Sequence, residues 1–219
     1  MNRGRIRIKV CGITRLADAL CAAEAGVDAL GFIFHPASPR YIAPEAARRI
    51  IEQLPPFIAT VGVFVDRERT EVEEIIRYCC LGYAQLHGQE SPQYCERLHR
   101  LASPCQIIKA FRVGFHTTAA EFEPYVPFVK AFLLDTYDKE LAGGTGKSFD
   151  WSLIDLLRLA RPYILAGGLD RGNIGAALQA GTVRGVDVNS GVESSPGSKD
   201  HHLLRAFVAA VRRREGEGC

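Results

Sequence analysis

The sequence predicts one (β/α)8 barrel, in a single domain that spans residues 1–219. Three observations support this fold class. The chain has 219 residues, which fits one domain of ordinary to large size. Eight short apolar runs alternate with helical patterns from one end to the other, as the repeating units of a barrel require. No linker, low-complexity tract or second domain is visible. An open doubly wound sheet is the alternative, but that class seldom repeats the unit so evenly.

The expected strands are short, and several are near-continuous apolar runs, as is typical of buried parallel strands. They are residues 6–11, 29–34, 60–65, 83–87, 107–113, 131–136, 163–166 and 185–189.

Helix signals lie between these runs. Most are polar residues that precede an apolar pattern and can accept a hydrogen bond from the first turn of a helix. The predicted N-caps are Thr14, Thr70 in a capping box with Glu73, Ser91 followed by Pro92, Asp150 and Asp170. A last helix is expected over residues 200–213.

Composition limits the classes of function. With 47% hydrophobic residues, 24% charged residues and a net charge of +2, nothing favours a nucleic-acid or membrane partner. The seven cysteines are odd in number and form no CxxC pair, so neither a disulfide framework nor a zinc site is expected, and no cofactor is predicted. The basic N-terminus lacks a following apolar run, and no stretch of about 18 apolar residues occurs. We expect a reducing, cytoplasmic location.

In a barrel the chemistry belongs at the carboxyl ends of the strands. Cys11 ends the first run just before a glycine and a predicted helix, whose dipole would favour the thiolate and lower its pKa. The alternative is a small buried hydrophobe. Asp135 ends the sixth run, where partial desolvation would raise its pKa and suit it to donate a proton. The alternative is an N-cap or a loop ion pair.

Further polar residues follow other strands. Arg40 lies in a loop stiffened by two prolines and could hold a carboxylate with two hydrogen bonds, or simply cap a surface turn. Gln85 and His87 alternate with an apolar residue, so both could point into the barrel mouth, although a lone histidine is more often structural. Lys109 on the fifth strand could form a Schiff base, which keeps an aldolase possible.

The glycine-rich ends of the seventh and eighth strand units predict an anion-binding site. Gly167 and Gly168 end the seventh unit, and the eighth ends in Asp187 followed by a short polar loop. Backbone N–H groups at such turns can bind a phosphate, and phosphate sites in barrels commonly follow strands 7 and 8. The predicted phosphate-binding residues are Gly167, Gly168, Asn189, Ser190 and Gly191. A glycine-rich stretch at 143–147, which includes Gly144, predicts a lid or a close backbone approach to the ligand. Gln85, His87, Gly144 and Asp187 complete the candidate substrate contacts.

The motifs at these strand ends occur in a specific order. They are KVCGIT at 9–14, LGFIF at 30–34 with SPRY at 38–41, VGVFV at 61–65, QLHG at 85–88, LD at 134–135 with GGTGKSFDW at 143–151, LAGGL at 165–169 and DVNSGVE at 187–193. Together they cover essentially the whole chain and resemble the phosphoribosylanthranilate isomerases of tryptophan biosynthesis. One departure is the loop 136–140, which is bulkier and more charged than the family pattern.

The resemblance implies a metal-independent Amadori rearrangement of N-(5′-phosphoribosyl)anthranilate in a monomer or homodimer. The implied roles are Cys11 as general base, Asp135 as general acid, Arg40 on the anthranilate carboxylate, and Gly167, Gly168, Ser190 and Gly191 around the phosphate. Three alternatives stay open. The first is a histidine-pathway isomerase, which uses two aspartates where this chain has a cysteine. The second is a Schiff-base aldolase on Lys9 or Lys109, and the third is a phosphate-binding barrel without catalysis.

Overall fold

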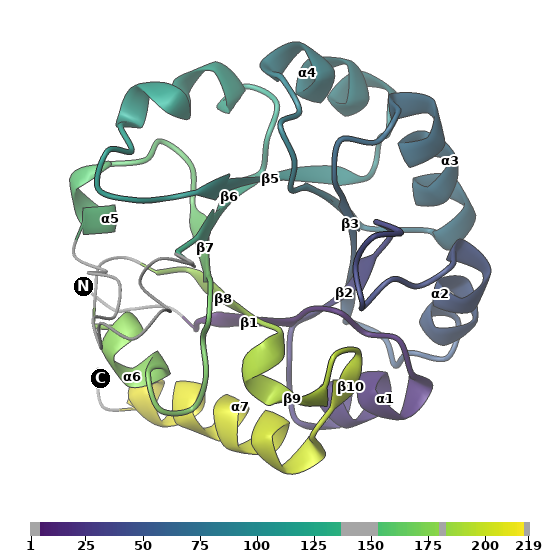
Figure 1. The fold of residues 1–219 in the computed structure, drawn as a ribbon, viewed down its shortest axis with the longest axis vertical. Helices are drawn as coiled ribbons and strands as arrows, with labels where there is room; N and C mark the ends of the chain where they lie inside the picture. Colours follow the sequence, from purple (N-terminus) through teal and green to yellow (C-terminus); the bar gives the residue numbers. More distant parts are fainter. Residues whose placement is uncertain (1–4, 137–152, 180–182, 217–219) are drawn as a thin grey trace.

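A computed structural model describes residues 5–136, 153–179 and 183–216. Its centre is a closed barrel of eight parallel strands in chain order, so the predicted fold class is confirmed (Figure 1). The strands are β1 (Arg7–Val10), β2 (Ala29–Ile33), β3 (Ala59–Phe64), β4 (Tyr83–Leu86), β5 (Gln106–Arg112), β6 (Ala131–Asp135), β7 (Tyr163–Ala166) and β8 (Gly185–Val188). The barrel closes because β1 and β8 pair in register from Arg7 with Gly185 to Val10 with Val188.

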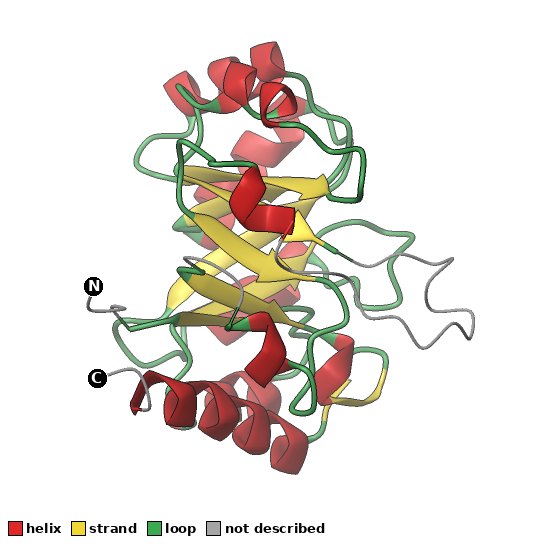
Figure 2. Cartoon of the chain, turned by 90° about the vertical axis from the view of Figure 1, so that its left-hand side faces the viewer, coloured by secondary structure: helices red, strands yellow, loops and turns green. Residues whose placement is uncertain are grey.

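Seven α-helices among the described residues surround the strands, as Figures 1 and 2 show. They are α1 (Leu16–Glu24), α2 (Pro44–Ile51), α3 (Arg69–Cys79), α4 (Pro92–Leu101), α5 (Leu153–Leu156), α6 (Ile174–Ala177) and α7 (His201–Gly216). None of the helices in the described part of the chain is both long and apolar enough to cross a membrane.

The expectation of a helix after every strand is wrong between β5 and β6. Two 3-10 turns, η1 (Ala119–Glu121) and η2 (Glu123–Tyr125), stand there instead. Pro124 and Pro127 lie in this segment and cannot donate the backbone hydrogen bonds of a helix interior. Phe122 is buried between the two turns and packs against Phe111 and Phe132, so aromatic contacts cover this part of the barrel.

Two predicted helix starts are confirmed. The Ser91 hydroxyl accepts a hydrogen bond from the backbone of Tyr94, with Pro92 in the first turn of α4. Asp200 stands directly before α7, and its carboxylate accepts from the backbone N–H groups of His202 and Leu203. The predicted cap at position 150 lies outside the described residues.

Two other predicted caps are wrong, because Thr14 and Glu73 bond to other partners. The hydroxyl of Thr14 donates to the carbonyl of Gly197, and α1 begins two residues later without a side-chain cap. Thr70 lies inside the first turn of α3, which begins at Arg69, and Glu73 pairs with that arginine instead of closing a capping box. Local signals therefore placed these two helices correctly and their end contacts incorrectly.

A small hairpin between β8 and α7 is an element the sequence analysis does not predict. Its strands are β9 (Glu193–Ser195) and β10 (Ser198–Lys199), which pair antiparallel. The main core lies between the barrel and the helices. A second, smaller apolar cluster on β3, β5, β6 and β7 fills part of the barrel interior, and Lys9, Gln85 and Asp187 are buried polar residues on the neighbouring strands. Charge is thus buried near the centre of the fold, where each charged group needs a partner.

Candidate active site

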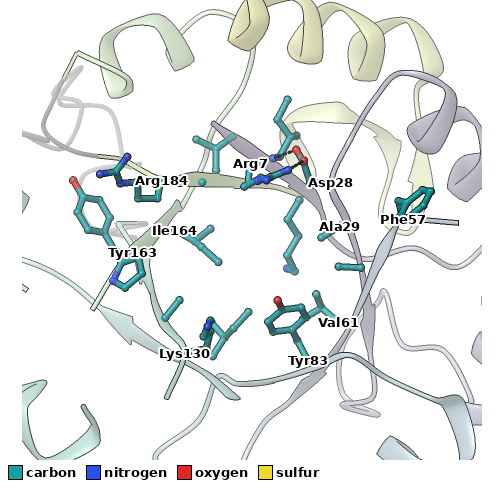
Figure 3. Close-up of a pocket in the computed structure, with 18 residues that line it drawn as sticks. Arg7, Asp28, Ala29, Phe57, Val61, Tyr83, Lys130, Tyr163, Ile164 and Arg184 are labelled. Atoms are coloured by element: carbon teal, nitrogen blue, oxygen red, sulfur yellow. Dashed lines mark hydrogen bonds and ion pairs between the residues drawn. The ribbon is translucent and has the colours of Figure 1, made fainter. Parts of the chain in front are cut away.

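The barrel has a cavity near each end. The cavity at the amino ends of the strands has a volume of about 440 Å³ (Figure 3). Its walls are largely apolar, with Arg7 paired to Asp28 and with Lys130 and Arg184 also in its lining. Cysteine and histidine are both absent from the described residues that line it. The expected proton-transfer groups therefore do not lie at this end.

The cavity at the carboxyl ends, of about 410 Å³, brings together most of the predicted site. The predicted residues that line it are Cys11, Arg40, Gln85, His87, Asp135, Gly167, Gly168, Asp187, Asn189 and Ser190. Gly191 is not part of the lining, and Gly144 lies outside the described residues. His35, for which the sequence predicts no role, also lines this cavity.

Cys11 follows β1 directly and lies against the next strand. Its side chain is almost fully buried, and its backbone N–H donates to the carbonyl of Val188 on β8. A methyl group added at Gly31 on β2 would come within 2.8 Å of the Cys11 sulfur and 3.1 Å of the Lys9 ammonium nitrogen. Glycine at this position therefore leaves room for both side chains to approach each other.

The expectation that a helix dipole lowers the pKa of Cys11 is wrong. The helix that follows begins only at Leu16, and the dipole effect falls off within one turn. Burial raises the pKa of the Cys11 thiol above its ordinary value, and the positive charges of Lys9 and Lys199 lower the pKa without cancelling the effect of burial. The charge that opposes burial comes from lysines, not from a helix.

Asp135 ends β6 and takes part in a series of polar contacts with side chains of the cavity lining. Its side chain keeps 22% of its solvent exposure, so the carboxyl is partly desolvated as predicted. The Gln85 amide donates to Nδ1 of His87 at 2.8 Å, which places the ring hydrogen on Nε2. That Nε2 faces the Asp135 carboxyl at 3.4 Å. Gln85 and His87, both predicted to face the barrel mouth, thus orient one another beside Asp135.

Asp187 and Lys9 form a buried ion pair inside the barrel. Lys9 Nζ donates to one carboxylate oxygen of Asp187 at 2.7 Å, and both side chains are at most 8% exposed. The other carboxylate oxygen, Oδ1, is buried and accepts no hydrogen bond from any described residue, as is also true of the Gln85 amide oxygen. Buried acceptors of this kind are normally satisfied, so two of them in one cavity lining suit a ligand that brings hydroxyl donors.

Arg40 is held by a carboxylate that the sequence analysis does not single out. Its Nε and Nη2 donate to Glu193 at 2.7–3.0 Å. Glu193 also accepts from Lys199 at 2.8 Å and from the backbone of Gly197 at 3.1 Å, and Lys199 donates to the Asn189 side chain. The hydrogen bonds to Arg40 and Lys199 outweigh burial and lower the pKa of Glu193. Glu193 stood within a recognised motif, but no local signal marked Lys199.

The glycine pair after β7 has a conformation that side chains rarely adopt. Gly167 and Gly168 have φ values of +94° and +63°. Gly191, after β8, approaches the backbone of Leu169 so closely that a Cβ at this position would overlap the Leu169 carbonyl oxygen. The close approach brings the loops after β7 and β8 together, which explains why Gly191 supports the cavity without lining it.

Asp170 does not cap α6 as predicted. Its carboxylate accepts from the backbone of Gly172 and Asn173 and so caps the turn before the helix. Asn173 accepts from the Asp170 backbone and donates to the carbonyl of Gly168 at 2.8 Å. This turn fixes the glycine pair at the edge of the cavity.

Lys109 is placed away from the cavity and is bonded on several sides. Four acceptors lie within hydrogen-bond distance of its ammonium, a carboxylate oxygen of Glu90 and the carbonyls of Leu86, Gly88 and Ala110, which is enough to engage all three of its hydrogens. The side chain is buried, so these contacts satisfy a structural charge. The geometry therefore disfavours an aldolase based on Lys109.

Fold and cavity together define an enzyme of the (β/α)8-barrel class, with its site at the carboxyl ends of the strands. The family model described as N-(5′-phosphoribosyl)anthranilate (PRA) isomerase matches residues 8–210. The chain therefore belongs to the N-(5′-phosphoribosyl)anthranilate isomerase family.

Individual relatives agree with the family match. The chain is 47% identical over 207 residues to an N-(5′-phosphoribosyl)anthranilate isomerase of Geobacter sp. strain M21, which covers 94% of this chain and 98% of the relative. A crystal structure of phosphoribosyl anthranilate isomerase in complex with reduced 1-(o-carboxyphenylamino)-1-deoxyribulose 5-phosphate is 39% identical. Its TM-score is 0.80, with 95% of this chain and 99% of that chain covered. Monomers generated from the dimeric enzyme of Thermotoga maritima are 38% identical, with a TM-score of 0.82 and coverage of 94% and 98%.

Proposed function

We propose that the chain converts N-(5′-phosphoribosyl)anthranilate to 1-(2-carboxyphenylamino)-1-deoxyribulose 5-phosphate by general acid–base catalysis, with Asp135 as acid and Cys11 as base. The reaction is the Amadori rearrangement of tryptophan biosynthesis. One observation carries the assignment of the two groups: Cys11 after β1 and Asp135 on β6 line the same cavity at the carboxyl ends of the strands.

The two groups have complementary tasks. Asp135 gives its proton to the furanose ring oxygen while the C1′–O bond breaks and the amine nitrogen forms a Schiff base with C1′. Cys11, as thiolate, removes the proton from C2′, which produces an enolamine. The enolamine loses the proton of its C2′ hydroxyl and gains one at C1′, which gives the aminoketose. Each assisted proton transfer accelerates the reaction by about 10²–10⁴.

Substrate contacts follow from the lining of the cavity. Glu193 occupies Nε and Nη2 of Arg40, which leaves Nη1 without a described partner and suited to the anthranilate carboxylate. The unpartnered oxygens of Gln85 and Asp187 suit the ribose hydroxyls. The predicted phosphate contacts are Gly167, Gly168, Asn189, Ser190 and Gly191, of which the last acts through loop packing.

The test follows the loss of anthranilate-type fluorescence. The substrate is made in situ from anthranilate and phosphoribosyl pyrophosphate with the preceding transferase. Cys11→Ala and Asp135→Asn should each lower kcat by about 100-fold or more. Cys21→Ala is the matched control, because Cys21 is as buried as Cys11 but lies on α1 outside the cavity, and it should keep normal turnover. Near-normal turnover of folded Cys11→Ala or Asp135→Asn would remove that residue from the mechanism.

We also propose that one chain is catalytically sufficient and that a homodimer is the alternative assembly. The proposed catalytic pair and its cavity lie within one chain, whereas the Thermotoga maritima relative is described as dimeric. Light scattering combined with specific activity over a wide protein concentration range tests this, because a required dimer would lose activity on dilution. The six described cysteines are free thiols, which supports a cytoplasmic location, and cell fractionation tests it.

A further inference from the structure

We infer that Lys9 is a positioning residue that supplies the positive charge for the Cys11 thiolate, and that Asp187 anchors Lys9 at that place. The inference rests on the proposed function, because only a base at position 11 needs to be ionised. It replaces the helix dipole as the source of positive charge near the sulfur.

The position of Lys9 on β1 carries the argument. Lys9 precedes Cys11 by two residues, so both side chains leave the extended backbone on the same side. Both surround the space left by the missing side chain of Gly31, with the sulfur and the ammonium nitrogen at similar distances from that point. Lys9 is 4% exposed, and no ion other than Asp187 pairs with it among the described residues. A buried ammonium near a buried thiol favours the thiolate.

Lys9 and Asp187 have opposite effects on the ionisation of Cys11, because their charges have opposite signs. The ammonium of Lys9 favours the thiolate, whereas the negative charge of Asp187 opposes it. Burial lowers the pKa of Lys9, but Asp187 and Cys11 raise it by more, so the net direction is upward and Lys9 stays charged. Asp187 therefore fixes the cation in place and partly weakens its effect on the sulfur.

The other charged groups near the sulfur form hydrogen bonds or ion pairs with partners other than Cys11. Lys199 on β10 also favours the thiolate, but its ammonium donates to Glu193 and Asn189. Arg40 is held by the same glutamate. Asp135 and His87 face one another elsewhere in the cavity lining. Lys9 is the described cation whose only ionic partner lies deep in the barrel beside the thiol.

The test measures the ionisation of Cys11 without turnover. The full-length protein is treated with iodoacetamide from pH 6 to pH 10, and alkylation of the Cys11 peptide is followed by mass spectrometry. Cys80 is exposed and serves as an internal control for reagent and pH in the same digest. Lys9→Met should move the alkylation midpoint of Cys11 to higher pH and slow the reaction at pH 8 by about tenfold or more. Asp187→Asn should move the midpoint to lower pH, because the asparagine oxygen can still accept the hydrogen bond that holds Lys9 in place but carries no negative charge.

Opposite shifts separate this proposal from a structural role. If the ion pair only stabilised the barrel, both variants would change Cys11 in the same direction or not at all, and either result would overturn the proposal. Lys9→Arg keeps the charge and should retain a midpoint closer to the original than Lys9→Met. The double variant Lys9→Met/Asp187→Asn leaves no unpaired charge and keeps the test valid if a single variant does not fold. Its midpoint should lie between those of the single variants.

The outcome is independent of the proposed reaction. Cys11 alkylation reports the thiolate even if turnover does not use it, so normal turnover of Cys11→Ala would refute the base role alone. An unchanged midpoint in folded Lys9→Met would refute the role of Lys9 alone.

Discussion

Replacing Glu193 by glutamine tests whether the β9–β10 hairpin orients Arg40. Glutamine has nearly the same shape but no charge, so Glu193→Gln removes the negative partner of Arg40 and Lys199 together. Glu193 is 4% exposed, Lys199 is fully buried and Arg40 is 20% exposed. Breaking a buried ion pair on one side costs about 3–5 kcal/mol, and the partial exposure of Arg40 favours the lower end, about 3 kcal/mol.

Two assays read this change. At roughly 2–4 °C per kcal/mol for a chain of this size, Tm should fall by about 6–12 °C. KM should rise about tenfold, because Arg40 is no longer held in place and a charge-assisted hydrogen bond contributes about 1.5–3 kcal/mol. The proposed acid and base do not contact Glu193, so kcat should change by less than about threefold. Circular dichroism and steady-state fluorescence measure these quantities.

A matched variant makes the result interpretable. Glu52 pairs with Arg48 on the surface of α2, where both side chains are exposed, so Glu52→Gln should change neither Tm nor KM. The reasoning is refuted if Glu193→Gln matches Glu52→Gln, or if it lowers kcat and leaves KM unchanged.

The stabilisation by the ion pairs of Glu193 should also depend on pH. Because the folded state lowers the pKa of Glu193 from 4.5, its ion pairs contribute stability above about pH 4.5. That contribution is lost as the pH falls through the lower folded pKa. Glu193→Gln should lack this component, so the difference from the unmodified chain should be largest near neutral pH and shrink in acid.

Three further changes have definite expectations. Asp18→Asn should destabilise the fold by about 2–3 kcal/mol above pH 3.8. Hydrogen bonds from an arginine and a histidine lower the pKa of this buried carboxyl against the effect of burial. In urea unfolding measured as a function of pH, the difference in stability between the variant and the unmodified chain should vanish in acid. Gly191→Ala should weaken phosphate-ligand binding and stability, because its Cβ would overlap the backbone of the neighbouring loop, whereas Gly114→Ala has open space and should be neutral in the same calorimetric titration. Ser91→Ala should cost about 1 kcal/mol by loss of the α4 cap, while Thr70→Ala, where no cap formed, should stay within about 0.5 kcal/mol in denaturant unfolding.

The sequence was sufficient for the barrel because its signals are local. Each strand is a short apolar run, and the ends of parallel strands necessarily converge on one rim, so Cys11 and Asp135 could be placed together without coordinates. Helix existence was predicted on the same basis. The segment between β5 and β6 was the exception, since Pro124 prevents a regular helix there.

Contacts between distant residues were beyond this kind of reasoning. Thr14 is a residue type that commonly caps helices, yet its hydroxyl donates to the carbonyl of Gly197, 183 positions away. Arg40 was predicted from its loop, but its partner Glu193 lies 153 positions further along the chain. The pKa of Cys11 was misjudged for the same reason, because burial, which depends on tertiary structure, raises it, and the charges that oppose burial come from lysines rather than from a helix.

These distant contacts share one location, the seam where the barrel closes. Lys9 on β1 donates to Asp187 on β8, and the backbone N–H of Lys199 donates to the carboxylate of Asp18. The hydroxyl of Thr14 donates to the carbonyl of Gly197 in the turn of the β9–β10 hairpin. Closing a loop of such length adds little to the entropic cost, since each doubling costs about 0.6 kcal/mol. The long separation in sequence therefore adds little to the cost of these contacts compared with a shorter loop. The contact of Lys9 with Asp187 and that of Arg40 with Glu193 therefore both require the first two strand units to pack against the segment that follows β7.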